Sequence, residues 1–233
     1  MSPELSPDLL ARSEVHAALG DPVRLAIVEE LATSDRSSSE LAERFRLATN
    51  LLAHHLGVLE RVGLVRRTTS AGDRRRRYVQ LRRDRVPTVV PVRHAPAGRA
   101  LFVCTHNSAR SQLAAALWRA RTGAAADSAG THPADRIHPR AVEVARRSGL
   151  DLSDARPRTL RPGDLSADVV VTVCDRAHEE LDGSAQWLHW SIPDPAEDGR
   201  ARAFSAAFAE LESRIDALVP PPAVHPPANG ARR

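Results

Sequence analysis

The sequence predicts two domains, a mainly helical one that ends in a β hairpin and an α/β one built on a parallel sheet. Two observations predict this division. Up to residue 83, apolar residues recur at helical spacing and a pair of β-prone runs follows. From Arg99 onward, short apolar runs alternate with amphipathic helical patterns, which is typical of a doubly wound sheet. Between them, residues 84–98 contain Pro87, Pro91 and Pro96 and are expected to form an extended linker.

The first domain, residues 1–83, begins with helices. Residues 8–32 carry apolar side chains at helical spacing, and Gly20-Asp21-Pro22 divides them into two helices, with Asp21 as the expected N-cap of the second. The stretch Ser37-Ser38-Ser39-Glu40 is a helix-start pattern and predicts a third helix. A fourth follows over residues 50–62, and a glycine ends it.

A hairpin completes this domain. Two β-prone runs, residues 64–69 and 76–81, flank the turn Ser70-Ala71-Gly72-Asp73. Three of these four helices, followed by such a wing, form a winged helix-turn-helix. Candidate DNA-binding residues on the expected exposed side of the fourth helix are Thr49, Asn50, His54 and His55. The cationic run of the wing, Arg74, Arg75, Arg76 and Arg77, suits phosphates, although a solvated charged turn explains the run alone equally well.

Two stretches carry a resemblance to a known family. Residues 18–25 (ALGDPVRL) and 55–65 (HLGVLERVGLV) resemble the first-helix and recognition-helix regions of the ArsR-type repressors. The resemblance implies a homodimer that inserts the helix over residues 50–59 into the major groove of a double-stranded DNA operator and lays the wing against the backbone. The domain lacks the cysteine pairs of the family's arsenite sensors, and a proline-containing linker replaces the family's C-terminal dimerisation helix. The inducer and the mode of dimerisation therefore stay open.

The overall composition restricts the compartment and the class of protein. Of 233 residues, 42% are hydrophobic and 27% charged, as in a globular protein, and the net charge of +4 allows an acidic partner. Two cysteines argue against a disulfide scaffold and suit a reducing cytosol. The sequence has neither a signal-peptide pattern nor an apolar run near the roughly 20 residues of a membrane helix. We expect a soluble, cytoplasmic protein that does not bind membranes.

The second domain is expected over residues 99–219. Its strands are predicted over residues 100–103, 125–130, 169–173 and 187–190, and its helices over residues 111–121, 139–148 and 201–218. In a doubly wound sheet of this kind, ligands bind at the carboxyl ends of the strands. The proline-rich tail, residues 220–233, is expected to be disordered.

The loop after the first of these strands predicts an oxyanion site. It reads Cys104-Thr105-His106-Asn107-Ser108-Ala109-Arg110-Ser111, between an apolar run and a strong helical pattern. Inward-facing backbone N–H groups and the helix N-terminus would cradle a tetrahedral anion such as arsenate or phosphate. The positive potential of these N–H groups and of the helix N-terminus also favours the thiolate form of Cys104. Arg110 can hold two oxygens of the anion at once. The nucleophile and the anion site therefore coincide. The candidate substrate-binding residues are Thr105, His106, Asn107, Ser108, Ala109, Arg110 and Ser111.

Several stretches of this domain resemble the low-molecular-weight tyrosine phosphatase fold and, within it, the arsenate reductases. They are the loop above, residues 128–131 (SAGT) with 133–136 (PADR), residues 171–174 (VTVC), and His189-Trp190 leading to Asp194-Pro195-Ala196. The resemblance implies that Cys104 attacks arsenic or phosphorus, Arg110 holds the equatorial oxygens and Asp194 is the general acid. It also implies that Ser111 stabilises the thiolate and that Asn107 braces the loop. The other interpretation of Asp194 is a turn residue before a proline, which the remaining stretches make the less favoured one.

The substrate and the reductant follow from what surrounds these stretches. A phosphotyrosine phosphatase needs an aromatic wall after the Asp-Pro pair, whereas Ala196-Glu197-Asp198 follow here and the one tyrosine, Tyr78, lies in the other domain, which favours arsenate. Thioredoxin-coupled relatives use two further cysteines. The first corresponds to Cys174, but Leu181 stands near the second position. Three possibilities follow: Cys174 alone resolves the arsenylated Cys104, an external thiol of the low-molecular-weight or thioredoxin type does so, or turnover is poor. The alternative interpretation of Cys174 itself is an inert buried residue.

The leading hypothesis is therefore a fused arsenic-responsive transcriptional regulator and thiol-dependent arsenate reductase, with no bound cofactor and no metal. Two alternatives stay open. In one, the second domain only senses an oxyanion for the DNA-binding domain. In the other, the protein is a protein tyrosine phosphatase with a regulatory DNA-binding domain.

Overall fold

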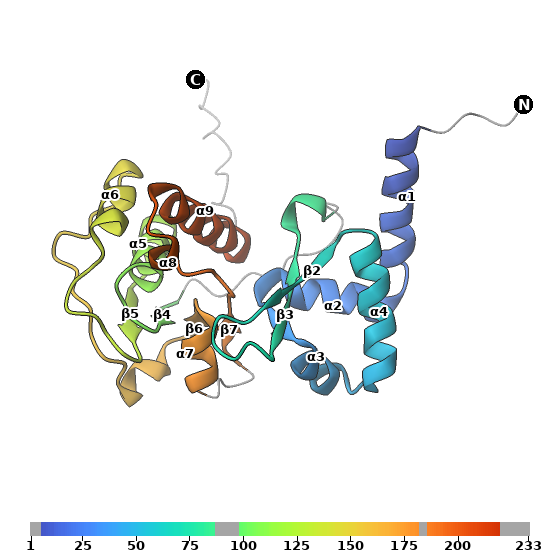
Figure 1. The fold of residues 1–233 in the computed structure, drawn as a ribbon, viewed down its shortest axis with the longest axis horizontal. Helices are drawn as coiled ribbons and strands as arrows, with labels where there is room; N and C mark the ends of the chain where they lie inside the picture. The colour runs from blue at the N-terminus through green and yellow to red at the C-terminus, as the bar shows by residue number, and fades with distance from the viewer. Residues whose placement is uncertain (1–5, 87–97, 182–185, 220–233) are drawn as a thin grey trace, which may run out of the picture.

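The computed structural model describes residues 6–86, 98–181 and 186–219, and shows two domains packed side by side (Figure 1). Most of the predicted linker and the whole predicted tail lie outside the described residues. The first domain contains the helices α1 (Pro7–Leu19), α2 (Pro22–Thr33), α3 (Ser38–Phe45) and α4 (Thr49–Arg61), and the strands β1 (Arg36–Ser37), β2 (Val65–Thr69) and β3 (Arg77–Leu81).

The helix starts predicted for this domain are confirmed. Asp21 caps α2, and its side chain accepts a hydrogen bond from Arg24 N at 3.0 Å. Ser37 and Glu40 form a reciprocal capping box at the start of α3. The wing is an antiparallel β2–β3 pair, as predicted, but β1 adds a third strand beside β3. A two-residue strand is too short to leave a periodic pattern, so the sequence analysis missed it.

The start of the linker differs from the prediction. Residues Arg83–Arg85 form a 3-10 turn rather than extended chain. The guanidinium of Arg83 holds the turn against the first domain by donating a hydrogen bond to Ala32 O at 3.0 Å. Asp84 therefore belongs to a folded turn, and the prediction that the extended linker begins there is wrong.

The second domain is a four-stranded parallel sheet covered by helices, in the order β5-β4-β6-β7. This confirms the predicted doubly wound α/β fold. Its elements are β4 (Ala100–Cys104), α5 (Arg110–Thr122), β5 (Ala126–Gly130), α6 (Pro139–Arg147), a 3-10 turn (Pro162–Ser166), β6 (Val169–Thr172), α7 (Asp175–Glu180), β7 (Leu188–His189), α8 (Pro195–Asp198) and α9 (Ala201–Leu218). The short helices α7 and α8 were not predicted.

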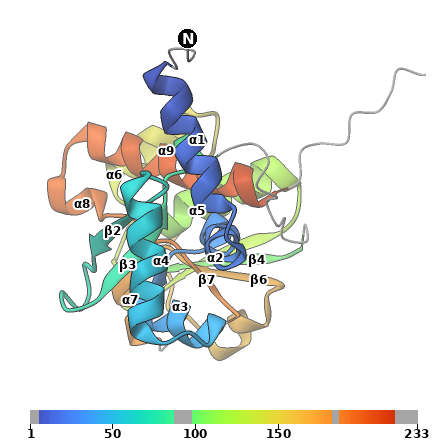
Figure 2. The ribbon, with the colours of Figure 1, turned by 90° about the vertical axis from the view of Figure 1, so that its right-hand side faces the viewer.

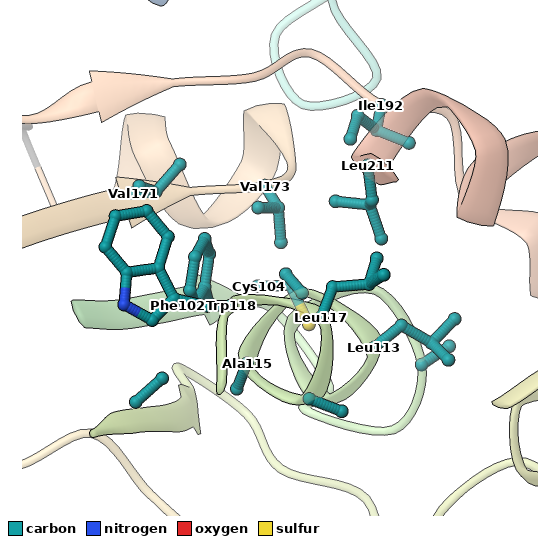
Figure 3. Packing of buried hydrophobic residues seen from close by; sticks show 14 of the residues in the cluster. Phe102, Cys104, Leu113, Ala115, Leu117, Trp118, Val171, Val173, Ile192 and Leu211 are labelled. Atoms are coloured by element: carbon teal, nitrogen blue, oxygen red, sulfur yellow. The ribbon is translucent and has the colours of Figure 1, made fainter. Parts of the chain in front are cut away.

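The core of this domain fixes the place of Cys104. Strand β4 is central, and all five of its residues are buried. Figure 3 shows Phe102 among Trp118, Val171 and other apolar side chains, with the sulfur of Cys104 at the end of the strand. The ring of Phe102 lies 6.0 Å from that of Trp118, between centroids. Cys104 thus sits at the carboxyl end of a buried strand, where α/β folds place their ligands.

Helix α9 is the longest described helix, with 18 residues. It buries Phe204, Leu211 and Ile215 against the sheet domain, and its other positions include charged residues such as Glu212. In the described parts of the chain, no helix combines the length and the apolar character needed to cross a membrane.

Buried polar contacts join the two domains. Asp35, just before β1, is fully buried, and its Oδ2 lies 2.9 Å from Arg214 Nη2 on α9. The same oxygen accepts hydrogen bonds from Ser191 N at 2.8 Å and from Gln80 Nε2 at 2.9 Å. Trp190 Nε1 donates to Thr33 O at 2.9 Å. A charge this deeply buried requires a partner, so these contacts bind the domains in one arrangement. Helix α4 lies on the side of the first domain that faces away from the second (Figures 1 and 2).

Candidate active site

The loop between β4 and α5 turns its carbonyl groups outward. The segment after β5 supplies the donors: Thr131 N to Cys104 O (3.2 Å), His132 N to Thr105 O (2.8 Å), Ala134 N to His106 O (2.9 Å) and His138 N to Ser108 O (2.9 Å). In a planar trans peptide, the N–H points opposite to the carbonyl to which it is joined. The N–H groups of the loop therefore face inward: Asn107 N points to the Cys104 sulfur and Thr105 N to the Cys174 sulfur, each at 3.2 Å. This arrangement forms an anion cradle.

Gly130 and Asn107 allow the loop to close tightly. A Cβ at Gly130 would lie 2.7 Å from Thr105 O and 3.0 Å from Asn107 Cβ, so only glycine permits this approach. Asn107 is fully buried and adopts φ +49°, a left-handed conformation that asparagine tolerates better than most residues. Its side chain donates to Ser111 Oγ at 2.9 Å and accepts from Arg158 N at 2.9 Å. These contacts hold the loop from the inside.

Two groups contact the sulfur of Cys104. Its Sγ lies 3.1 Å from Ser111 Oγ and accepts a hydrogen bond from Asn107 N at 3.2 Å. The side chain is 2% exposed, so an attacking thiolate is screened from bulk water. Ser111 and Asn107 thus lie where a nucleophilic sulfur needs donors.

Arg110 and Asp194 face each other across the site. The guanidinium donates from Nη1 to Ile192 O at 2.7 Å and from Nη2 to Asp194 Oδ2 at 2.6 Å. Burial would lower the pKa of Arg110, but Cys174, Cys104 and Asp194 together raise it, so the guanidinium stays charged. Asp194 Oδ1 also accepts from Ala196 N at 3.0 Å and caps α8. The residue is therefore both a turn cap and a carboxylate of the site.

Cys174 lies directly against the loop. Its Sγ accepts a hydrogen bond from Thr105 N at 3.2 Å and lies 3.4 Å from Thr105 Oγ1. Burial raises the pKa of the Cys174 thiol, Arg110 lowers it and the nearby Cys104 raises it further, with a net increase. Both cysteines are free and buried. Leu181, where a relay cysteine would fall, is the C-cap of α7 and packs against the core.

A cavity of about 250 Å³ opens between these residues. It is lined by Ala71, Thr105, His106, Arg110, Cys174, Asp175, Arg176, Asp194, Ala196 and Glu197. The remaining loop residues, Cys104, Asn107 to Ala109 and Ser111, build the loop and do not line the cavity. The sequence analysis missed Ala71, Asp175 and Arg176, because no local pattern indicates which distant segments meet. Among the described residues, no three His, Cys, Asp or Glu side chains are arranged to hold a metal ion.

Comparison with known families identifies the family of the second domain. Residues 99–225, more than half of the chain, match the model of the low molecular weight phosphotyrosine protein phosphatase family. The chain belongs to this family. Residues 19–68 match the model of a helix-turn-helix domain, which covers α2 to most of β2. Both predicted resemblances are therefore confirmed at the level of the domain.

Relatives within the phosphatase family include arsenate reductases. The arsenate reductase of Halalkalibacterium halodurans is 34% identical over 121 residues, which are 49% of this chain and 86% of the relative. That of Brevibacillus brevis is 35% identical over 101 residues, 41% of this chain and 75% of the relative. Among solved structures, a low molecular weight protein tyrosine phosphatase from T. tengcongensis is 29% identical, with a TM-score of 0.46 over 52% of this chain and 96% of that one.

The helix-turn-helix domain presents most of the predicted DNA-binding residues to solvent. Thr49, Asn50 and His54 are exposed on α4, and the arginines at 74–77 are exposed on the wing. His55 is not exposed: it is 7% accessible, and its Nδ1 lies 3.7 Å from Asp21 Oδ1. The prediction that it lies on the exposed side of the helix is wrong, because His55 shares the buried face of α4 with Leu52, Leu56 and Leu59, at helical spacing.

Proposed function

We propose that the protein is an arsenic-responsive transcriptional regulator fused to a thiol-dependent arsenate reductase. The observation that carries the proposal is the second buried thiol, Cys174, which contacts the same loop as the nucleophile through Thr105 N at 3.2 Å. Hydrolysis of a phosphate ester needs one nucleophile, whereas reduction of arsenate consumes two electrons and therefore two thiols. The arsenate reductases among the relatives support the same choice.

In this proposal, arsenate binds with its oxygens on the loop N–H groups and on the two terminal nitrogens of Arg110. The anion takes over the Nη2 hydrogen bond that Asp194 accepts at 2.6 Å without substrate. The freed carboxylate of Asp194 takes up a proton from solvent and donates it to the departing oxygen as the general acid. The cavity meets this need because Arg110, Asp194 and two further loop residues, Thr105 and His106, line it.

The chemistry then takes two steps. In the first, the Cys104 thiolate attacks arsenic, an As–S bond forms, an As–O bond breaks and the protonated oxygen leaves as water. In the second, the Cys174 thiolate attacks the Cys104 sulfur, so a disulfide forms and the electron pair of the As–S bond stays on arsenic. Arsenic passes from As(V) to As(III) and leaves as arsenite. An external thiol, of the low-molecular-weight or thioredoxin type, reduces the disulfide for the next turnover, which requires a reducing compartment such as the cytoplasm.

The test is arsenite production from arsenate with each class of thiol, comparing wild type, Cys104→Ser and Cys174→Ser. We expect Cys104→Ser to abolish product with every thiol. Cys174→Ser should lower turnover with thioredoxin by at least tenfold and leave binding of inorganic phosphate unchanged within about threefold. No Cys104-dependent arsenite with any thiol would exclude the reductase. Hydrolysis of a phosphotyrosine peptide well above the rate of arsenate turnover would assign the site to a phosphatase instead.

We further propose that the first domain binds a DNA operator through α4 and the wing. Thr49, Asn50 and His54 would meet base edges, and the arginines at 74–77 would meet phosphates. Support comes from the exposure of these residues and from the position of α4 away from the second domain (Figure 2). Affinity for the protein's own promoter should fall as the salt concentration rises. The double variant Arg74→Gln with Arg75→Gln should reduce the slope of log affinity against log salt concentration by about two. An unchanged slope would contradict the docking.

A homodimer is part of this proposal. On α1, the adjacent leucines Leu9 and Leu10 are 42% and 47% exposed, so they offer apolar surface to a second copy. We propose that they contact the same helix of a second copy. Leu9→Glu with Leu10→Glu should convert a dimer into a monomer by light scattering, whereas Asp8→Asn on the same helix should not. A mass unaffected by the leucine changes would place the dimer contact elsewhere.

A further inference from the structure

The loop of the wing, residues Ser70–Asp73 (the wing loop), reaches out of the first domain to the oxyanion cavity. Figure 1 shows the β2–β3 hairpin between the two domains. Ala71 of this loop lines the cavity, whose other lining residues all belong to the second domain. The site described above is therefore composite, with one part of its wall supplied by the helix-turn-helix domain.

The wing loop is held by α7, the helix that begins directly after Cys174. Ala71 N donates to Asp175 Oδ2 at 2.8 Å, which ties the loop to the residue next to the second thiol. The carboxylate of Glu179 accepts from Ser70 Oγ at 2.7 Å, from Asp73 N at 2.6 Å and from Tyr78 OH at 3.1 Å. One glutamate thus anchors three groups of the hairpin, two from the loop and one from β3.

Two further observations indicate that the docking is built into the sequence. A Cβ at Gly72 would overlap the Glu179 carboxylate and lie 3.1 Å from Arg176 Cα, so the loop approaches α7 as closely as only glycine allows. Burial would raise the pKa of Asp175, but hydrogen bonds from His189 and Ala71 N hold it below its usual range. The acceptor of the Ala71 N–H therefore stays ionised at neutral pH.

We propose that the wing loop determines substrate size: it closes the cavity to esters and admits only a bare tetrahedral oxyanion. That the admitted oxyanion is arsenate rests on the proposed function, whereas the exclusion of esters from the cavity does not. Asp194, the proposed acid for the leaving group, lines the cavity that Ala71 walls, so the leaving group of an ester would have to fit into this cavity. The cavity, at about 250 Å³, is smaller than the roughly 300–1,000 Å³ that hold drug-sized ligands. The residues that follow Asp194-Pro195 in its wall, Ala196 and Glu197, offer no aromatic surface to an aryl group.

The test compares binding of inorganic phosphate and phenylphosphonate by calorimetry. Glu179→Ala removes the three anchors of the hairpin, and Gly72→Val forces the loop off α7. Both variants should gain at least tenfold in affinity for phenylphosphonate relative to inorganic phosphate, and both should gain Cys104-dependent hydrolysis of p-nitrophenyl phosphate. Glu180→Ala is the matched control, because its carboxylate faces His132 rather than the wing loop. The control should keep the wild-type ratio.

The outcomes separate this inference from the proposed function. A changed binding ratio in a protein that makes no arsenite would support the wing loop as a size filter and refute the reductase. Arsenite production with an unchanged ratio in folded variants would refute the size filter alone. A wild type that binds both anions equally would also refute it. If Gly72→Val fails to show a cooperative thermal transition, Glu179→Ala, which introduces no clash, decides the question.

Discussion

Replacing Asp35 with asparagine should lower the free energy of unfolding by about 3 kcal/mol, because it breaks a buried ion pair between the domains. Both side chains of the pair are almost inaccessible, with 0% exposure for Asp35 and 1% for Arg214. Removing one partner of such a pair typically costs about 3–5 kcal/mol. We expect the lower end, because Arg214 Nε keeps Glu210 Oε1 at 2.6 Å. The amide can still accept from Ser191 N, which retains part of the network.

Urea denaturation measures this loss with two probes. The three tryptophans, Trp118, Trp187 and Trp190, all lie in the second domain, so fluorescence reports its unfolding, while far-UV circular dichroism reports helices of both domains. In wild type the two transitions should coincide. In the variant the dichroism should begin to change first, because the first domain has lost its anchor. Asp154→Asn, at an exposed position, is the control. A loss below about 1 kcal/mol, or transitions that still coincide, would refute the reasoning.

Three further changes test the site and its surroundings. Gly130→Ala should weaken binding of inorganic phosphate at least tenfold by calorimetry while the fold persists, since its Cβ would lie 2.7 Å from a loop carbonyl; an unchanged Kd would contradict the loop geometry. In Cys104→Ser, alkylation of Cys174 by iodoacetamide should still accelerate above pH 9, because burial raises the pKa of this thiol; a plateau below that pH would contradict it. Burial opposes ionisation of Glu40, but hydrogen bonds with His178 and Ser37 lower its pKa to about 2. The contribution of Glu40 to stability is therefore present above pH 4.5 and is lost as the pH falls toward 2. Glu40→Gln should therefore flatten the fall in unfolding free energy across that window, and an identical fall in both proteins would argue against the assigned partners.

The features that the sequence predicted correctly depend on neighbours along the chain. Asp21 and the Ser37–Glu40 box cap helices because the groups they bind lie three residues away. The apolar run over residues 169–173 predicted a central strand because a strand covered on both faces admits few polar residues. The strand before the Cys104–Ser111 loop and the helix after it were equally local, since an apolar run and a helical pattern flank the loop directly.

The features that the sequence did not predict depend on distant segments. Asp35 and Gln80 are polar residues that local patterns assign to the surface, yet both are buried because Arg214 and Ser191 meet them across the domain junction. Ala71 lines the cavity for the same reason, since only the docking of the hairpin on α7 brings it there. His55 was assigned to solvent because a polar residue on an amphipathic helix is usually exposed, and its burial depends on a neighbouring helix.

A single turnover without external thiol tests the central claim most directly. The fully reduced protein is mixed with excess arsenate, quenched with acid and analysed for arsenite and for the state of Cys104 and Cys174 by mass spectrometry. The account predicts up to one arsenite per chain and, in the same proportion, a disulfide between the two cysteines. A folded wild-type protein that yields no arsenite and keeps both thiols would contradict it.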